Sequence, residues 1–262
     1  MSQPDPAVQA EPAQPKAQVL SVVIPAYNEA PTIHKILDLV VAVPLALHKE
    51  IIVVDDGSRD GTGDAVTRWA LTHKDTPGLA VRVITKQNGG KGTAVRKGIE
   101  VSTGDFVLIQ DADLEYEPND YPKLLEPLLK GETDVVYGSR TLGPDKPGTP
   151  MFYWGGRVVT WWTNLLYLTW ITDEPTCYKV FRGDLIRSIP LECTGFEFCP
   201  EVTAKVLKLG HKIVDVPIRY HPRSIEEGKK IRAKDGFIAL WELFRWRFKR
   251  VRTQPPGEAP KP

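Results

Sequence analysis

Apolar runs alternate with amphipathic stretches along the first half of the chain. The β-branched run Val19–Ile24 predicts a buried strand, and apolar residues at helical spacing after Pro31 predict the helix that follows. The same alternation predicts further strands at 50–54, 81–84, 106–109 and 134–137, separated by helices at 61–71, 91–101 and 119–129. Asn119 is the expected N-cap of the last of these helices. This rhythm predicts an α/β fold with one parallel, doubly wound sheet.

The alternation weakens after Gly143, where an aromatic-rich stretch covers 151–171. Beyond it the pattern predicts strands at 178–181 and 212–216, and helices at 201–209 and from Asp235 to about Arg250. We therefore expect four parts: a disordered leader at 1–18, a main α/β domain at 19–220, a basic segment with the terminal helix at 221–252, and a disordered tail at 253–262.

Chemically active side chains follow the predicted strands. Ligands of doubly wound sheets bind at the carboxyl ends of the strands. Here those ends carry Asn28 and Glu29, Asp55 and Asp56, Lys86 to Lys91, Asp111 and Asp113, and Arg140. Charges scattered over a surface would not recur at one edge, so the sequence predicts a single site there.

Three acidic residues alternate directly after the strand at 106–109, in Asp111-Ala-Asp113-Leu-Glu115. Alternate side chains of an extended segment face the same way, so these would form an oxygen cluster suited to Mg²⁺ or Mn²⁺. Such ions usually complete their coordination with substrate phosphates. A solvated acidic loop is the alternative, and the segment alone does not decide between the two.

Other segments at this edge are suited to a nucleotide. The pair Asp55-Asp56 can accept hydrogen bonds from a base or a ribose, although a strand–helix turn capped by Asp60 would have the same composition. The segment Asn88 to Gly92 is a glycine-rich turn with Lys91 ahead of a helix N-terminus, which resembles a phosphate loop but is not a Walker motif. Arg140 is suited to clamp a diphosphate.

Four segments taken together resemble family 2 glycosyltransferases. They are Pro25-Ala-Tyr27-Asn-Glu29, Val54 to Thr62, Asn88 to Gly92 and Asp111 to Glu115, in that order. The closer likeness, from about Val19 to Ile218, is to the dolichol-phosphate mannose synthase group of polyprenyl-phosphate glycosyltransferases. The resemblance implies a GT-A fold for the domain at 19–220. It also implies inverting transfer of a hexose, mannose or glucose, from a nucleoside diphosphate sugar.

Residue roles follow from the resemblance and from position. Nucleotide-sugar binding is expected of Pro25, Tyr27, Glu29, Asp55, Asp56, Lys91 and Asp111. The metal ligands implied are Asp111, Asp113 and Glu115, the last standing where the group often has glutamine. The catalytic candidates are Asp113, Arg140 and Asp173.

Basic residues are expected to meet the acceptor. The segment Asp173 to Arg182 resembles the acceptor segment of the family, with Cys177 replacing the usual glycine and Lys179 the usual arginine. The expected acceptor-phosphate contacts are Lys179, Arg182, Arg223, Lys229, Lys230 and Arg232, the last four lying in a stretch that would otherwise be a solvated basic linker. A polyprenyl phosphate is already an anion and needs no base, whereas a hydroxyl acceptor would need Asp173 or Asp113 to accept its proton.

Charge and apolar surface concentrate near the C-terminal end. The net charge of +1 indicates no nucleic-acid partner, yet 221–252 holds ten Lys and Arg against four Asp and Glu. No run reaches the ~20 apolar residues of a membrane span. The last predicted helix aligns Phe237, Trp241, Phe244 and Phe248, which is typical either of an interfacial helix or of one packed on the domain. We expect peripheral association with the cytoplasmic face of a membrane.

The function expected is hexose transfer from GDP-mannose or a UDP-sugar to a dolichyl or undecaprenyl phosphate. One alternative is transfer to a sugar hydroxyl in polysaccharide or glycolipid synthesis, and another is a non-catalytic nucleotide-binding scaffold. The intact acids at Asp111, Asp113 and Glu115 argue against the scaffold. Three cysteines without CxxC spacing predict neither a disulfide framework nor a zinc site.

Overall fold

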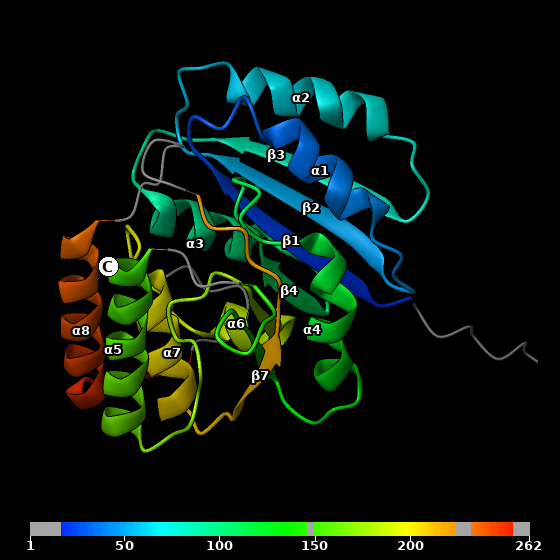
Figure 1. Ribbon diagram of the computed structural model, residues 1–262. Helices are drawn as coiled ribbons and strands as arrows, with labels where there is room; N and C mark the ends of the chain where they lie inside the picture. Colours follow the sequence, from blue (N-terminus) through cyan, green and yellow to red (C-terminus); the bar gives the residue numbers. More distant parts are fainter. Residues whose placement is uncertain (1–16, 146–148, 224–231, 254–262) are drawn as a thin grey trace, which may run out of the picture.

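A seven-stranded, mostly parallel sheet forms the centre of the protein, which the computed structural model describes for residues 17–145, 149–223 and 232–253 (Figure 1). The strand order is β3-β2-β1-β4-β6-β5-β7. The strands are β1 (Val19–Ala26), β2 (His48–Asp55), β3 (Leu79–Thr85), β4 (Phe106–Ile109), β5 (Val135–Ser139), β6 (Lys179–Arg182) and β7 (Ile213–Pro217). The predicted doubly wound sheet is confirmed, except that β6 runs antiparallel to β4 and β5.

Helices cover both faces of the sheet. They are α1 (Ile33–Ala42), α2 (Thr62–His73), α3 (Lys91–Val101), η1 (Pro118–Asp120), α4 (Tyr121–Leu129), α5 (Pro150–Tyr167), α6 (Gly183–Ser188), α7 (Phe198–Lys208) and α8 (Ala233–Phe248). One face packs against α1, α2 and α4, and the other against α3, α6 and α7. Helices α5 and α8 run parallel to one another and lie beside α7, away from the sheet (Figure 1).

The alternation of side chains along β1 explains why the strand is apolar on both faces. Val22 and Ile24 pack against the layer of α1, α2 and α4, whereas Val23 packs against the layer of α3 and α7. All three side chains are fully buried. Burial of one such side chain contributes about 1.5–3 kcal/mol, so a central strand with apolar residues on both faces stabilises two layers at once.

Three local features differ from the sequence-based expectation. The N-cap predicted at Asn119 is wrong, because Glu117 caps the short helix η1 with its side chain and α4 begins only at Tyr121. The aromatic-rich stretch at 151–171 contains the long helix α5. Helix α6 had no counterpart in the prediction, because its six residues are too few to show a helical period.

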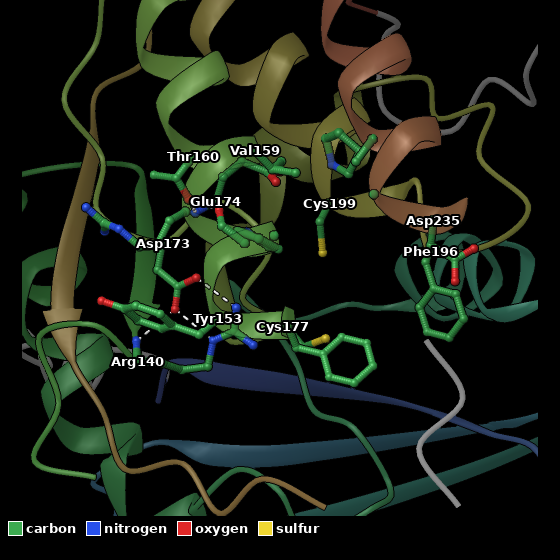
Figure 2. A pocket seen from close by; sticks show the side chains of 18 of the residues that line it. Arg140, Tyr153, Val159, Thr160, Asp173, Glu174, Cys177, Phe196, Cys199 and Asp235 are labelled. Atoms are coloured by element: carbon green, nitrogen blue, oxygen red, sulfur yellow. Dashed lines mark hydrogen bonds and ion pairs between the residues drawn. The ribbon is translucent and has the colours of Figure 1, made fainter. Parts of the chain in front are cut away.

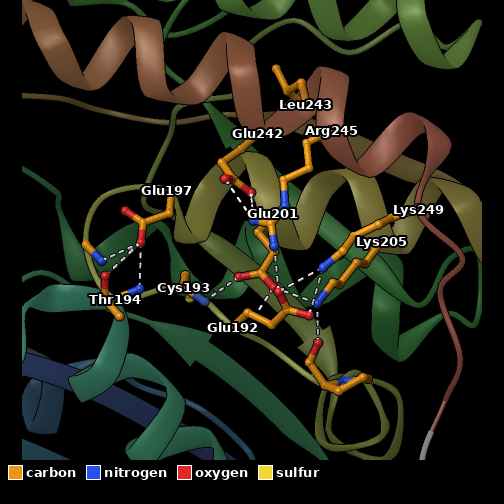
Figure 3. A network of polar contacts seen from close by, with 12 residues as sticks. Glu192, Cys193, Thr194, Glu197, Glu201, Lys205, Glu242, Leu243, Arg245 and Lys249 are labelled. Carbon is orange, nitrogen blue, oxygen red and sulfur yellow. Dashed lines mark hydrogen bonds and ion pairs between the residues drawn. The ribbon is translucent and has the colours of Figure 1, made fainter.

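A polar network holds the segment before α7 against α8 and α3 (Figure 3). The buried Glu201 accepts hydrogen bonds from the backbone of Glu192 and Cys193, both at 2.7 Å, and pairs with Lys205 at 2.5 Å. The same segment approaches the start of α3 so closely that a Cβ at Gly90 would overlap the Thr194 carbonyl oxygen. Gly90 also has φ of 93°, so only glycine fits this contact.

One acid is buried in this scaffold without full compensation. Glu174, between α5 and β6, has no exposed surface. One of its carboxylate oxygens accepts from Thr203 at 3.2 Å, and the other has no hydrogen-bond partner. Burial, only partly opposed by the charge of Lys179, raises the pKa of Glu174 to about 8. The folded protein therefore holds a proton there at neutral pH.

We predict that Glu174→Gln reduces the pH dependence of stability. The folded pKa is raised, so the wild-type contribution is full below the unfolded pKa of about 4.3 and is lost as pH rises towards 8. Urea unfolding at pH 5, 6.5 and 8 should show wild type losing up to about 1.4 kcal/mol per pH unit relative to the variant. The exposed Glu132→Gln is the matched control and should follow wild type. Parallel stability curves for wild type and Glu174→Gln would contradict the assignment.

Candidate active site

The loops after four parallel strands meet at one edge of the sheet. Ala26 pairs with Asp55 and Asp55 with Thr85, which aligns the ends of β1, β2 and β3. Ile109, the last residue of β4, pairs with Val23 of β1. The polar segments at 27–29, 55–58, 86–91 and 111–115 therefore share this edge, as the sequence predicts.

Asp56 joins two of these loops. Its carboxylate accepts hydrogen bonds from the backbone N–H groups of Gly89 at 3.0 Å and Gly90 at 2.7 Å. It also pairs with Lys86 at 2.5 Å. The acid predicted to contact the base thus shapes the glycine-rich loop in this structure, and both of its oxygens are engaged there.

The other predicted nucleotide-binding residues lie around the same edge. Asp55 is buried and accepts a hydrogen bond from the Ser58 backbone at 3.0 Å, so it stabilises its own turn. Glu29 is buried and Pro25 half-buried, whereas Tyr27 is 39% exposed. These residues surround the strand ends but do not line the cavity described below.

Lys91 and Asp111 form a buried ion pair. The Lys91 ammonium, in the first turn of α3, lies 2.6 Å from Asp111 Oδ1 and donates to Cys177 Sγ at 3.1 Å. Burial alone would lower the pKa of Lys91, but the contributions of Asp111, Cys177 and Cys199 together outweigh it and raise that pKa well above its ordinary value. Burial likewise opposes ionisation of Asp111, and Lys91 nevertheless lowers the Asp111 pKa. Both groups are therefore charged.

Arg223 lies among the remaining acids. Its Nη2 is 2.7 Å from Asp113 Oδ2, and its backbone N–H donates to Glu115 Oε1 at 2.8 Å. The guanidinium is also 3.8 Å from Glu29. Burial, followed by the charges of Asp111 and Glu115, raises the pKa of Asp113 to about 7. One arginine thus compensates several carboxylates, and the compensation at Asp113 is incomplete.

The three predicted metal ligands are not gathered into a preformed cluster. Within the described part of the chain, no three His, Cys, Asp or Glu side chains converge enough to hold one metal ion. Lys91 and Arg223 separately engage Asp111 and Asp113 instead. The donor set still fits a divalent cation, because carboxylate oxygens are the ligands of Mg²⁺ and Mn²⁺. The raised pKa of Asp113 reflects burial and then repulsion from Asp111 and Glu115, and a cation would relieve that repulsion.

Arg140 and Asp173 form a bidentate pair (Figure 2). Arg140 Nε and Nη2 each lie 2.8 Å from an oxygen of Asp173, and the Arg140 backbone N–H donates to the same carboxylate at 2.8 Å. The guanidinium also stacks 5.1 Å from the centroid of the Tyr220 ring. Asp173 is thereby held as the counter-ion of Arg140, an arrangement that does not favour it as a proton acceptor.

A cavity of about 460 Å³ adjoins these pairs (Figure 2). The predicted site residues that line it are Lys91, Asp111, Glu115, Arg140, Asp173, Arg223 and Arg232. The rest of its wall is mainly apolar and comes from α5, the start of α7 and the start of α8. The site therefore combines a charged region with a larger apolar space.

Two predicted acceptor contacts are wrong, one because its side chain is buried and the other because β6 is antiparallel. Lys179 has no exposed surface, and its ammonium donates to the Glu174 carbonyl at 2.7 Å and lies 3.5 Å from the Tyr137 ring centroid. Arg182 pairs with Phe106, the first residue of β4, so it lies at the opposite edge of the sheet. The predicted Lys229 and Lys230 lie outside the described residues.

Sequence reasoning missed two aromatic residues of the site. The Tyr220 hydroxyl donates to Glu115 Oε2 at 3.0 Å, which places the ring between that acid and Arg140. Phe196 lines the cavity, and the Lys91 ammonium lies 5.6 Å from its ring centroid. Both lie outside the named helices and strands, so no periodic pattern marks them and only their positions in the fold reveal them.

Helices α5 and α8 present aromatic side chains to solvent. Helix α8 packs on the domain through the buried Leu243 and Trp246, and its predicted stripe faces outwards. The large apolar side chains exposed on the pair are Met151, Trp154, Val158, Trp161, Leu165, Phe237, Ile238, Trp241, Phe244 and Phe248. We call these residues the α5–α8 aromatic face. None of the described helices is both long and apolar enough to span a membrane.

Comparison with solved structures supports the fold. Mannosyl-3-phosphoglycerate synthase from Rubrobacter xylanophilus superposes with a TM-score of 0.65 at 24% identity, over 92% of this chain and 79% of that one. Glucosyl-3-phosphoglycerate synthase from Mycobacterium tuberculosis, in complex with Mn²⁺, UDP-glucose and phosphoglyceric acid, gives a TM-score of 0.65 at 19% identity, over 92% and 88%. These likenesses confirm the GT-A type of fold.

Comparison with related sequences shows the family as well as the fold. The undecaprenyl-phosphate mannosyltransferase of Micrococcus luteus is 33% identical over 229 residues, which cover 79% of this chain and 85% of that protein. The dolichol-phosphate mannosyltransferase of Pyrococcus furiosus is 28% identical over 86% of this chain, which spans 63% of that longer protein. The profile described as Glycosyl transferase family 2 matches residues 21–183, more than half of the sequence. The chain therefore belongs to glycosyltransferase family 2.

Proposed function

We propose that this glycosyltransferase moves a hexose from a nucleoside diphosphate sugar to a polyprenyl phosphate, with inversion at the sugar carbon. The observation that carries the proposal is the mainly apolar cavity beside the acid–arginine site. A charged region next to a larger apolar space suits an acceptor with a phosphate head and a hydrocarbon chain. The names of the Micrococcus and Pyrococcus relatives support the same substrate class.

The donor would bind across the strand ends. Pro25, Tyr27, Glu29 and Asp55 surround the expected nucleoside position, and Asp56 would reach the base if the glycine-rich loop releases it. The candidate donors are GDP-mannose and a UDP-sugar, with mannose favoured by the names of the relatives.

Asp113 and Glu115, together with Asp111, are the residues that would hold Mg²⁺ or Mn²⁺. When bound, such an ion supplies positive charge against the diphosphate that leaves. Arg223 and Lys91 hold these carboxylates in place and compensate their charge. A solved neighbour in complex with Mn²⁺, UDP and phosphoglyceric acid supports use of a divalent ion in this fold.

The acceptor needs alignment more than activation. A phosphate oxygen is already anionic, so attack on the sugar carbon requires no proton acceptor. Arg223 and Arg232 line the cavity and would orient the acceptor phosphate and reduce its repulsion with the donor diphosphate. Asp173, engaged by Arg140, is poorly disposed to serve as the base that a hydroxyl acceptor would need.

The α5–α8 aromatic face gives a route to a lipid-borne acceptor. Its exposed tryptophan and phenylalanine side chains belong to the two helices whose inner surfaces line the cavity. Aromatic side chains of this kind enter the boundary between lipid headgroups and acyl chains. The protein would therefore act as a peripheral protein at the cytoplasmic face of a membrane.

Asp113→Ala should remove sugar transfer while the fold is retained. The variant loses a carboxylate expected to hold the divalent ion, and such losses cost on the order of a hundredfold or more in turnover. Transfer of labelled hexose to undecaprenyl phosphate with Mn²⁺ measures the loss, and circular dichroism measures the fold. The exposed Asp64→Ala is the control. Near-normal turnover of Asp113→Ala, or chelator-resistant turnover of wild type, would exclude the metal assignment.

Arg223→Ala should weaken use of the lipid phosphate more than binding of the nucleotide sugar. Loss of one charge-assisted hydrogen bond corresponds to about a tenfold rise in the KM for polyprenyl phosphate. The neighbouring Arg219→Ala is the matched control, because Arg219 pairs with Asp120 and does not line the cavity. Steady-state kinetics with each substrate varied in turn separates the effects. An unchanged acceptor KM would remove Arg223 from the acceptor site.

A further inference from the structure

Two of the three cysteines line the cavity from different parts of the chain. Cys177 is half-buried and precedes β6, and Cys199 is 8% exposed in the first turn of α7. Figure 2 shows both sulfur atoms directed towards the cavity. Cys193 differs, since it is 3% exposed and does not line the cavity. The chain thus contains a pair of cysteines at the site and one buried cysteine for comparison.

Backbone contacts hold the pair together. The Cys199 thiol donates to the carbonyl of Thr176 at 3.5 Å, and Thr176 is the residue directly before Cys177. The Cys177 backbone N–H donates to the Tyr116 hydroxyl at 3.0 Å, which fixes this residue from the other side. The two side chains also interact, because Cys199 raises the pKa of Cys177 and Cys177 lowers that of Cys199. Closure of the pair requires the two sulfur atoms to come together at a bond length of about 2.05 Å.

We propose that Cys177 and Cys199 are an oxidation site that closes a reversible disulfide across the wall of the cavity, with a peroxide as the oxidant. Peroxide is small enough to enter the cavity, and both thiols line it. Disulfides that form in reducing compartments are usually transient and redox-sensing, which matches a pair at an active site rather than a structural bridge.

The chemistry proceeds in two displacements. Cys199 lies in the first turn of α7, where a helix N-terminus favours a thiolate, and its interaction with Cys177 lowers its pKa to about 6, so the Cys199 sulfur is the nucleophile. It attacks peroxide, the O–O bond breaks, and the departing hydroxide takes a proton to become water, which leaves a sulfenic acid. The Cys177 sulfur then attacks that sulfur, the S–O bond breaks, and a second water leaves with the Cys177 proton. The two thiols lose two electrons, and one peroxide becomes two waters.

Closure would disturb the neighbouring ion pair. Cys177 Sγ accepts from the Lys91 ammonium at 3.1 Å, and Lys91 holds Asp111 at 2.6 Å. A bond to Cys199 draws the sulfur towards α7 and removes that acceptor. Lys91 and Asp111 lie where the donor is expected to bind, so oxidation should lower sugar transfer. This consequence rests on the proposed function, whereas formation of the disulfide does not.

Peroxide treatment of the reduced, full-length chain tests the oxidation site directly. Alkylation of the remaining thiols followed by peptide mass spectrometry should find one free thiol instead of three and a single link between Cys177 and Cys199. Cys193→Ala should still form this link. Cys177→Ser and Cys199→Ser should each lose it, and either variant suffices if the other misfolds. Three free thiols after treatment, or a link that includes Cys193, would overturn the proposal.

Activity separates the disulfide from its consequence. Transfer by wild type and Cys193→Ala should fall about tenfold on oxidation, the effect of one lost charge-assisted hydrogen bond, and recover with dithiothreitol. The residual transfer of Cys177→Ser should not respond to peroxide. A mapped disulfide with unchanged transfer would overturn the coupling through Lys91. Absence of transfer in the reduced protein would instead count against the proposed function and leave the mapping result valid.

Discussion

Arg223 lies between carboxylates that repel one another, and the charged part of the site depends on this compensation. Asp113 and Glu115 come from the loop after β4, and Glu29 comes from the loop after β1. Without a positive charge among them, acids this close at the end of a buried sheet would repel one another strongly, and burial with this repulsion already raises the pKa of Asp113. The guanidinium of Arg223 keeps these carboxylates close together, so that a metal ion can bind among them but is not needed for the fold.

The remainder of the scaffold keeps opposite charges in fixed positions. Lys91 begins α3 directly after the glycine-rich loop, and Asp56 holds that loop by its backbone N–H groups. The network of Glu201 and Lys205 fixes the segment that precedes α7 against α3 and α8 (Figure 3). Helix α8, which carries part of the exposed aromatic face, is thus joined through packed and polar contacts to the loop at the expected donor site.

Sequence patterns predicted the parallel half of the fold well, because its strands are buried on both faces and its helices are amphipathic. The loops after β1 to β5 could be assigned to one edge for the same reason, since strand direction alone places them there. The pattern could not show the direction of β6, because four residues are too few to indicate which strands they pair with or in which direction. Arg182 was misplaced as a result, whereas Lys179 was misplaced because the pattern could not show that its side chain is buried against Glu174 and Tyr137. The pairs of Arg140 with Asp173 and of Arg223 with Asp113 depend on contacts over 33 and 110 residues, which no local pattern encodes.

The reversed strand has a consequence for how this protein can vary. In a wholly parallel sheet, only residues after a strand reach the substrate side, and residues before it face away. Reversal of β6 brings the segment that precedes it, with Asp173 and Cys177, to the substrate side and sends Arg182 to the opposite edge. Substitutions on the two flanks of this one short strand should therefore have separate effects, the leading flank altering substrate preference and the trailing flank altering resistance to unfolding.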